Sequence, residues 1–330
     1  MKALRFIALW LAWIVAISCA AWAISALYFD FAFGSPRAPA AIGFAVLLIG
    51  AVLWVPGKLL KLAAVFGGSA LVACWWLQLQ PTNDRPWQPD VAQLAWAEIE
   101  GDEVTVHNVR NFDYRTETDF TQRWETRTVR LSQITGMDLA IMHWGSPWIA
   151  HPIVSFRFAD ALPLCFSIET RKTIGQRYSA LRGLYRQYTL IYVVADERDA
   201  IRLRSNYRQD EQVYLYQTKV PPERARTHFL EYLHTTNALR DHARWYNAVT
   251  SNCTTNIHTQ RSLRERMPWD WRLLLNGKAD EMLYERRNIA TAGLSFAQLK
   301  QRSLINQRAR AADQDPEFSR LIRVGLPQGN

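Results

Sequence analysis

Cys253 stands directly after a Ser-Asn pair in the segment WYNAVTSNCTTNI, residues 245–257. Thr250, Ser251 or Asn252 can each cap a helix whose first turn contains the thiol. Unpaired backbone N–H groups and the positive end of the helix dipole favour a thiolate in that turn. The residues therefore offer Cys253 as a nucleophile, but they leave open the usual role of a free cysteine, a small buried side chain.

A base for such a thiol is offered by two β segments, residues 151–158 and 162–169, which flank a short turn containing Asp160. We expect these segments to pair as an antiparallel hairpin. If the turn is centred near Asp160, His151 falls across from Glu169 or its neighbour, close enough for the side chains to meet. Alternation puts Ser155 on the face of His151, and Cys165 and Ser167 on the face of Glu169.

These residues predict a thiol-dependent catalytic group in which His151 is the base, Glu169 orients its imidazole and Cys253 attacks a carbonyl. Asn252 and the amides at the start of the helix would stabilise the oxyanion. A lone histidine on a strand is also often a hydrogen-bonded structural group. Cys165 can line the site or only pack in the core.

Other site chemistries have weaker support. A zinc site built from His143, His151, Cys165 and Cys253 lacks ligand pairs with finger-like spacing, so we expect no metal and no cofactor. Ser155 and Ser167 lack the glycines of a nucleophile elbow, which disfavours a serine hydrolase.

The N-terminal region positions this group relative to a membrane. Three apolar runs are each long enough to cross the hydrocarbon core as a helix, which takes about 18 to 20 residues: residues 4–29, 38–55 and 62–79. Lys2 and Arg5 stand at the start of the first run, and Lys58 and Lys61 lie between the second and third, which predicts a cytoplasmic N-terminus and a periplasmic C-terminal part. A cleaved signal sequence or a lipobox at the first run is an alternative that the two following runs disfavour.

The sequence predicts three parts: a membrane anchor over residues 1–80, a proline-rich linker over 81–92 and one globular domain over 93–330. Two of the four cysteines, Cys19 and Cys74, fall in the anchor, so a disulfide framework is excluded and at most Cys165 and Cys253 could pair. We expect strands at residues 93–98, 104–109, 125–131, 188–195 and 212–219, a helix beginning at Pro222 and mostly helix after Met267. This order indicates an α+β domain with an antiparallel sheet.

Several long blocks together resemble one family. They are HNVRNFDYRT (107–116), IAHPIVSFRFAD (149–160), FSIETRKTIGQRYSALRGLYRQYTLIYVVADERDAIRLRSNYR (166–208), VYLY (213–216) and the Cys253 segment. In this order they resemble the Lnb N-terminal periplasmic domain family, from about residue 90 to the C-terminus. The resemblance implies a permuted papain-like, NlpC-type fold in which the histidine precedes the cysteine, and lipoprotein N-acylation by a Cys and His pair.

Residue by residue, the resemblance carries over Cys253 in the NCTT block and His151 in the AHPIVSF block. Glu169 and Arg171 match its SIETR block. The layout differs from the family's, because membrane helices precede this domain and none follows it. The different layout puts in doubt the family's acceptor of the acyl group, but not its Cys-His chemistry.

We expect a membrane-anchored acyltransferase of the bacterial inner membrane that moves a fatty acyl group from phospholipid, through a Cys253 thioester, to an amine such as a lipoprotein N-terminus. Candidate substrate-binding residues are Arg171, Arg186, Arg198, Ser155 and Ser167. Arginines can bind lipid phosphates, but acidic residues lie among them, and a structural ion-pair network would give the same pattern. The formal charge of +9 does not indicate nucleic acid, because the domain is predicted to lie outside the cytoplasm.

Two alternatives stay open. The same Cys-His group could act as a peptidase or amidase on cell-wall peptides. The domain could also be a membrane-anchored interaction module in which Cys253 and His151 only pack.

Overall fold

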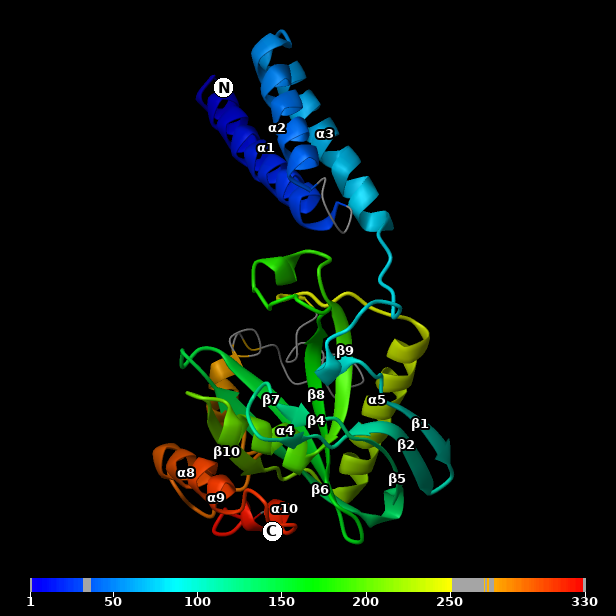
Figure 1. The fold of residues 1–330 in the computed structure, drawn as a ribbon. Coiled ribbons are helices and arrows are strands. Elements are labelled where there is room, and N and C mark those ends of the chain that lie inside the picture. The colour runs from blue at the N-terminus through cyan, green and yellow to red at the C-terminus, as the bar shows by residue number, and fades with distance from the viewer. Residues whose placement is uncertain (1, 32–36, 251–269, 271, 273–275, 329–330) are drawn as a thin grey trace. The chain divides into compact units, whose positions relative to one another are not determined.

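The computed structural model of the protein describes residues 2–31, 37–250, 270, 272 and 276–328. The chain divides into two compact units. The first contains Met1–Pro81, Tyr178–Tyr188 and Trp245–Asn247, and the second contains Thr82–Arg177, Thr189–Arg244 and Ala248–Asn330. Two short segments from the globular part of the sequence thus belong to the unit of the N-terminal helices (Figure 1).

The first unit is built on α1 (Lys2–Asp30), α2 (Arg37–Trp54) and α3 (Lys58–Gln78). All three helices are long and apolar enough to cross a membrane, as the sequence predicts. Ala16, Ala23 and Ala26 of α1 are fully buried, whereas most large side chains of the three helices are exposed. Small residues let helix backbones approach closely in a membrane, so this arrangement suits a lipid-facing bundle.

Asp30, at the end of α1, holds the segment Tyr178–Tyr188 within this unit. Its carboxylate accepts hydrogen bonds from Trp76 Nε1 at 2.7 Å, Gln187 Nε2 at 2.7 Å and the backbone N–H of Arg186 at 3.1 Å. The Arg186 side chain lies over the Trp76 ring. A buried carboxylate needs such donors, because an unpaired one is costly to desolvate.

The second unit is built on a sheet of eight strands with the order β1-β2-β9-β8-β7-β6-β10, in which β5 pairs with β2. The strands are β1 (Trp96–Glu100), β2 (Glu103–Arg110), β5 (Trp124–Arg130), β6 (Ile134–His143), β7 (Ala150–Phe158), β8 (Leu164–Arg171), β9 (Thr189–Asp196) and β10 (Gln212–Gln217). Neighbouring strands are antiparallel except for one parallel bridge between β2 and β9. Two short strands, β3 (Asp113–Tyr114) and β4 (Phe120–Thr121), form a separate pair.

The predicted hairpin of β7 and β8 is confirmed, and β1 and β2 pair as a second hairpin around Gly101-Asp102. The sequence did not predict β6, although it is the longest strand among the described residues. Eight of its ten residues are buried, so it lacks the alternation of a half-exposed strand. The mixed α+β class and the mostly antiparallel sheet are confirmed, while the permuted papain-like topology stays a prediction.

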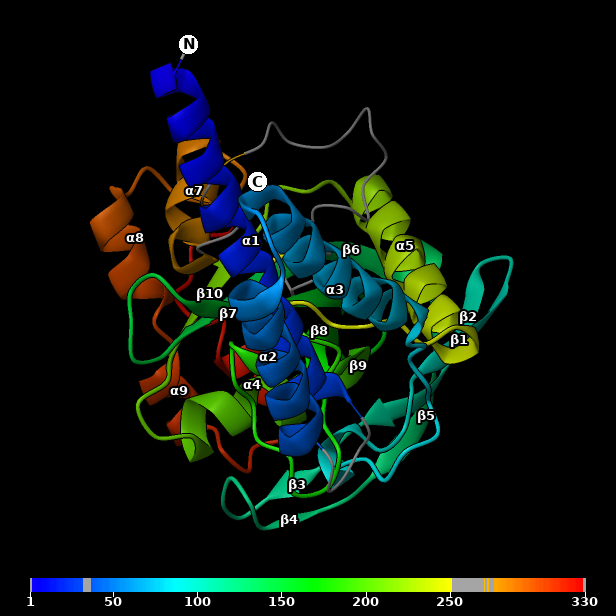
Figure 2. The same cartoon turned by 90° about the horizontal axis from the view of Figure 1, so that it is seen from above.

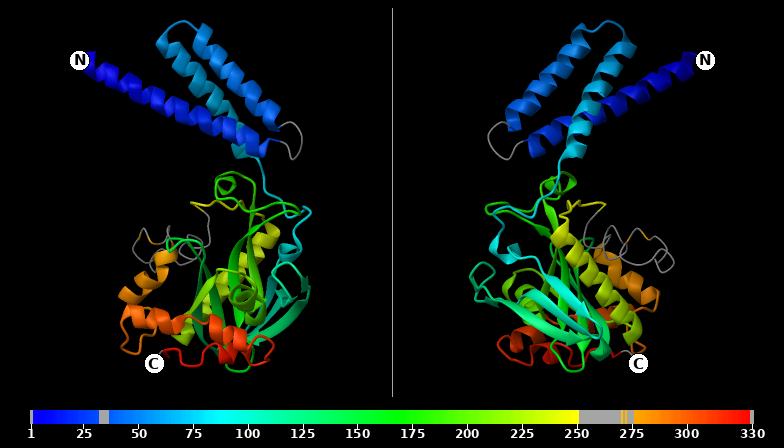
Figure 3. Two further views of the ribbon diagram at one scale, coloured as in Figure 1. Left: turned by 60° about the vertical axis from the view of Figure 1, so that its left-hand side comes forward. Right: turned by 90° about the vertical axis from the view of Figure 1, so that its right-hand side faces the viewer.

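Helices cover both faces of this sheet. On one face, α5 (Pro222–Asp241) packs Phe229 and Tyr232 against Phe156 and Phe166 (Figure 3). α7 (Ala279–Glu285) and α8 (Phe296–Ser303) add to that side near β10 (Figure 2). On the other face, α4 (Glu197–Arg202), α9 (Asn306–Ala311) and α10 (Phe318–Leu321) enclose an apolar cluster with β6 to β10. His151 lies on this second face, at the start of β7.

Candidate active site

The hairpin register brings His151 to Glu169. Ile153 pairs with Ser167 and Ser155 with Cys165, so His151 comes opposite Glu169 on the same face of the sheet. The Nε2 atom of His151 lies 3.5 Å from Glu169 Oε1. The structure thus confirms the predicted position of the turn, because the pairing of Ile153 with Ser167 centres the hairpin on Asp160.

Ser167 lies between these two groups. Its hydroxyl donates to Glu169 Oε1 at 2.8 Å, and its oxygen lies 2.7 Å from His151 Nε2. A hydroxyl has one hydrogen to donate, and that of Ser167 forms the hydrogen bond to Glu169. The Nε2–H of His151 must therefore donate to the Ser167 oxygen. In a neutral imidazole, the lone pair for accepting a proton is then on Nδ1.

The charges around Glu169 keep it ionised. Burial raises the pKa of the Glu169 carboxyl, but His151, Arg204 and Arg208 outweigh burial and hold that pKa well below its usual range. Arg204 Nη2 lies 3.3 Å from Glu169 Oε1, and its Nη1 lies 3.3 Å from Glu211 Oε2. Arg204 is buried, on one turn of π-helix formed by Leu203–Tyr207, so its guanidinium is fixed between two carboxylates.

The group is enclosed but not sealed. The His151 side chain is 10% exposed and the Glu169 side chain 28%. Beneath them lies a cavity of about 20 Å³, large enough for one water molecule. Its lining includes Asp90, Arg110, Ser167, Glu169, Arg204 and Arg208.

The arrangement is that of an oriented general base. A carboxylate held ionised by arginines fixes the ring position and tautomer of the histidine, and it stabilises the imidazolium that forms when the ring takes a proton. The described residues therefore hold His151, Ser167 and Glu169 next to one another on two paired strands, as an oriented base would require.

The predicted nucleophile Cys253 and the oxyanion residue Asn252 lie outside the described residues. The described chain resumes beside His151. Asn276 Oδ1 accepts a hydrogen bond from the N–H of Ala150 at 2.8 Å, and the Gly277 N–H donates to the Trp148 carbonyl at 3.1 Å. Residues 276 and 277 thus pack on the loop that leads into His151.

The other predicted substrate-binding residues lie apart from this group. Ser155 is fully buried and donates to Glu197, which also binds Arg323. The Arg171 guanidinium donates to the carbonyls of Val91 and Ala92, and burial lowers its pKa to about 10. In this structure neither residue presents a polar atom to a substrate near His151.

Arg186 and Arg198 likewise have structural surroundings. Arg186 Nη1 donates to the carbonyls of Leu77 and Leu79 in the first unit. The backbone N–H of Arg198 donates a hydrogen bond to the Asp196 side chain at the start of α4. The side chain of Arg198 is half-buried. Of the five candidate substrate-binding residues, the structure brings only Ser167 to His151, and it does so as an orienting group.

Cys165 is fully buried, and burial raises the pKa of its thiol well above the usual value. It therefore stays a protonated thiol that packs in the core. The alternative zinc site is also incompatible with the strand geometry, because two of its four proposed ligands, His143 and His151, lie on opposite faces of the sheet. His151 pairs with Met142, so His143, the next residue of β6, points to the opposite face of the sheet.

The sequence did not predict that Arg204 would be the partner of Glu169. The only signal was its place in an arginine-rich stretch, and which of those arginines turns inward depends on the π-type turn of Leu203–Tyr207. It also missed the contact of Gly277 with the loop before His151, because the two are far apart in sequence.

Comparison with known proteins supports the resemblance. A search of curated proteins gives no match, and a search of solved structures gives none either. The family model of the Lnb N-terminal periplasmic domain matches residues 120–277, a range that contains His151, Ser167, Glu169, Arg204 and Cys253. The matched range is narrower than the sequence blocks indicate, since it begins at β4 and ends at Gly277. Together with the three apolar helices, it fits a membrane-anchored protein with a periplasmic domain. Over residues 120–277 this chain thus matches the family of the Lnb N-terminal periplasmic domain.

Proposed function

We propose that this protein is a membrane-anchored, thiol-dependent acyltransferase that takes a fatty acyl group from phospholipid and passes it to an amine. The observation that carries the proposal is the histidine whose Nε2 faces Ser167 and an ionised Glu169. That arrangement suits a base that accepts a proton at Nδ1. The family match and the three membrane-length helices support action on a lipid at the periplasmic surface of the inner membrane.

In the first step, Cys253 loses its proton to His151 Nδ1, and the thiolate sulfur attacks an ester carbonyl of the phospholipid. Collapse of the tetrahedral intermediate forms the Cys253 thioester and expels the lipid alkoxide, which takes the proton from His151. In the second step, an amine attacks the thioester and gives its proton to His151. The amide leaves, and the proton returns to the Cys253 thiolate.

Glu169 keeps its negative charge through both steps, because Arg204 lies beside the carboxylate and Ser167 donates a hydrogen bond to it. Its part is to stabilise the imidazolium, not to carry the proton. Asn252 and amides near Cys253 are proposed to stabilise the oxyanion. The amine acceptor that fits the family is the N-terminus of a bacterial lipoprotein.

The test is the intact mass of the detergent-purified full chain after incubation with bacterial phospholipid. We expect a fatty-acyl adduct that disappears in Cys253→Ala and in His151→Ala. Cys74→Ala is the matched control, because it removes an exposed thiol from α3 and should leave the adduct unchanged.

No adduct on a folded wild-type protein would overturn the proposal. Release of an amine from peptidoglycan fragments would then favour the peptidase or amidase alternative. A large loss of thermal stability in Cys253→Ala, without any activity to lose, would favour the interaction module.

A further inference from the structure

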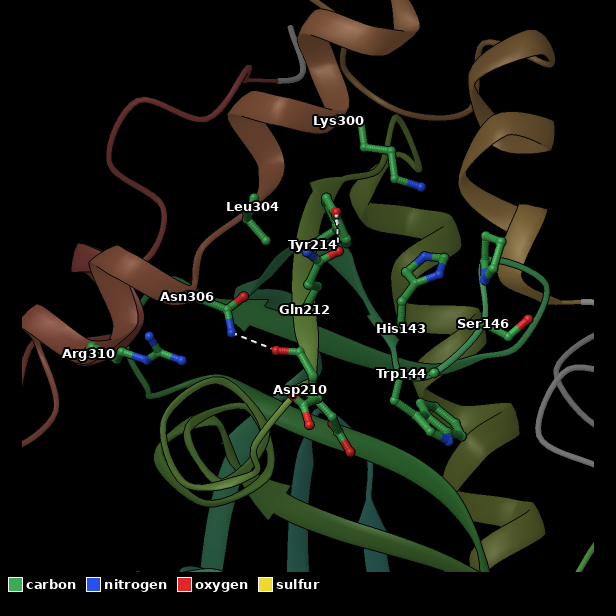
Figure 4. Close-up of a pocket in the computed structure, with 13 residues that line it drawn as sticks. His143, Trp144, Ser146, Asp210, Gln212, Tyr214, Lys300, Leu304, Asn306 and Arg310 are labelled. Atoms are coloured by element: carbon green, nitrogen blue, oxygen red, sulfur yellow. Dashed lines mark hydrogen bonds between the residues drawn. The ribbon is translucent and has the colours of Figure 1, made fainter.

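A polar pocket of about 720 Å³ lies at the β10 edge of the sheet. It is formed by the end of β6 and the following loop, the turn before β10, and helices α8 and α9 (Figure 4). Its lining includes His143, Trp144, Ser146, Asp210, Glu211, Gln212, Tyr214, Lys300, Asn306 and Arg310. A volume of this size accommodates a small ligand or the head group of a larger one.

His143 is the feature that points to a ligand. It is 8% exposed, it lines the pocket, and its Nε2 atom has no hydrogen-bond partner within the part of the chain that the structure describes. Tyr214 packs edge-on against its ring and offers no bond to that nitrogen. Burial, Lys300 and Lys278 lower the pKa of His143, against an opposing effect of Asp280, so its imidazole is neutral at neutral pH. A buried polar atom without a partner is costly unless something in the pocket binds it.

The pocket presents both signs of charge. Lys300 Nζ lies on the His143 side, 2.8 Å from Asp280 Oδ2 and 4.9 Å from the centre of the Tyr214 ring (Figure 4). Asp210 lies away from Lys300, in the turn before β10. The neighbouring Glu211 is already paired with Arg204 and Arg208. Asp210 therefore supplies a negative charge in that turn, Lys300 and Arg310 supply cations, and His143 supplies a neutral ring nitrogen.

The pocket also shares a wall with the candidate active site. Glu211 lines the pocket and lies 3.3 Å from Arg204, which lies 3.3 Å from Glu169, the partner of His151. The loop from Trp144 to Pro147 that borders the pocket leads directly into β7 and His151. A ligand in the pocket thus lies against elements that position the base.

We propose that this pocket binds a zwitterionic phosphoethanolamine group, with its phosphate at Lys300 and His143 and its ammonium at Asp210. The inference rests on the proposed function and deepens it, because it names the class of phospholipid that serves as acyl donor. A fatty tail does not fit the polar lining. A glycerol head group carries no cation to pair with Asp210, so an uncharged head group leaves that carboxylate unused.

Binding is tested by calorimetry on detergent-purified full-length Cys253→Ala protein, which binds without turning over. The probes are glycerophosphoethanolamine, glycerophosphoglycerol and inorganic phosphate. We expect glycerophosphoethanolamine to bind about tenfold more tightly than the other two, since each lacks the contact with Asp210.

His143→Phe and Asp210→Asn should each weaken that binding about tenfold. Lys219→Met, which removes an exposed lysine outside the pocket, should leave it unchanged. His143→Gln keeps a polar group at the site and should retain more affinity than His143→Phe, which separates lost binding from lost folding. Thermal unfolding of each variant checks the fold.

Three results would overturn the proposal: no binding of glycerophosphoethanolamine, equal binding of glycerophosphoglycerol, or wild-type affinity in a folded His143→Phe. Wild-type protein in nanodiscs tests whether the head group bound in the pocket is that of the lipid donating the acyl group. Adduct formation should be faster from phosphatidylethanolamine than from phosphatidylglycerol, and Asp210→Asn should remove that preference, because Asp210 is the proposed partner of the ammonium.

The two proposals fail separately. A wild-type adduct without glycerophosphoethanolamine binding would retain the acyltransferase and reject this pocket. Binding without any adduct would retain the pocket as a phosphoethanolamine site and reject the acyl chemistry.

Discussion

His151 Nε2 lies closer to the hydroxyl oxygen of Ser167, at 2.7 Å, than to the carboxylate of Glu169, at 3.5 Å. The serine therefore connects the histidine to its carboxylate, and all three side chains come from neighbouring positions on one face of a hairpin. Strands fix side-chain directions more tightly than loops do, so the orientation of the imidazole is built into the sheet.

Ser167→Ala should slow formation of the Cys253 acyl adduct about tenfold, because the loss of one orienting hydrogen bond is worth about 1.4 kcal/mol. The fall should appear in kcat rather than KM, since Ser167 is proposed to contact His151 and not the lipid. The matched control is Ser155→Ala. Ser155 is another buried serine on the same face of the sheet, but its hydroxyl binds Glu197 instead. It should lower thermal stability without slowing the reaction. An equal loss of rate in both variants would mean that Ser167 acts only through packing.

Glu169→Gln should lower the free energy of unfolding by about 1 to 3 kcal/mol at neutral pH, because Arg204 and Ser167 lose a charged acceptor. The pKa of Glu169 is depressed in the folded state, so its contribution is present above its usual pKa of 4.5 and is lost as pH falls below that value. Denaturant unfolding at several pH values should therefore show the two proteins converging below about pH 4.5. A stability difference that stays constant down to pH 3 would contradict this assignment.

Gly277→Ala should destabilise the second unit and reduce adduct formation together. A Cβ at this position would come closer than 3.0 Å to the backbone of Pro147, Trp148 and Ile149, and backbone atoms cannot move aside as a flexible side chain does. The loop would shift, and His151 lies two residues beyond it. Gly67→Ala, a helical glycine of α3 with open space around it, is the control and should be tolerated. Thermal unfolding should show a lower stability, and the mass assay less adduct, for Gly277→Ala than for Gly67→Ala.

Arg171→Lys should lower stability by about 1 to 3 kcal/mol and leave KM for phospholipid unchanged. The guanidinium binds the Val91 and Ala92 carbonyls and the Asn83 side chain, and it lies over the Trp87 ring at 4.3 Å. A lysine ammonium cannot reproduce that fork. Urea unfolding measures the stability, and lipid titration of the mass assay measures KM. A raised KM in a protein of normal stability would restore Arg171 as a substrate-binding residue.

The sequence by itself determined the features that depend on local pattern. Three apolar runs of membrane length predicted α1, α2 and α3. Alternation and a short turn predicted the β7–β8 hairpin, and with it the meeting of His151 and Glu169, because strand pairing converts sequence spacing into distance. The long blocks also predicted the family. The proline at position 222 predicted the start of α5.

Only the tertiary structure decided how side chains with the same residue type divide their roles. Ser155 and Ser167 lie on neighbouring strands and on one face of the sheet, yet Ser155 binds Glu197 of α4 and Ser167 binds His151. Arg204 turns toward Glu169 because of a π-type turn, while Arg171 turns toward backbone carbonyls. The partner of each polar group comes from an element distant in sequence. Local periodicity determines which face a side chain takes, but the packing of the whole domain determines what it meets there.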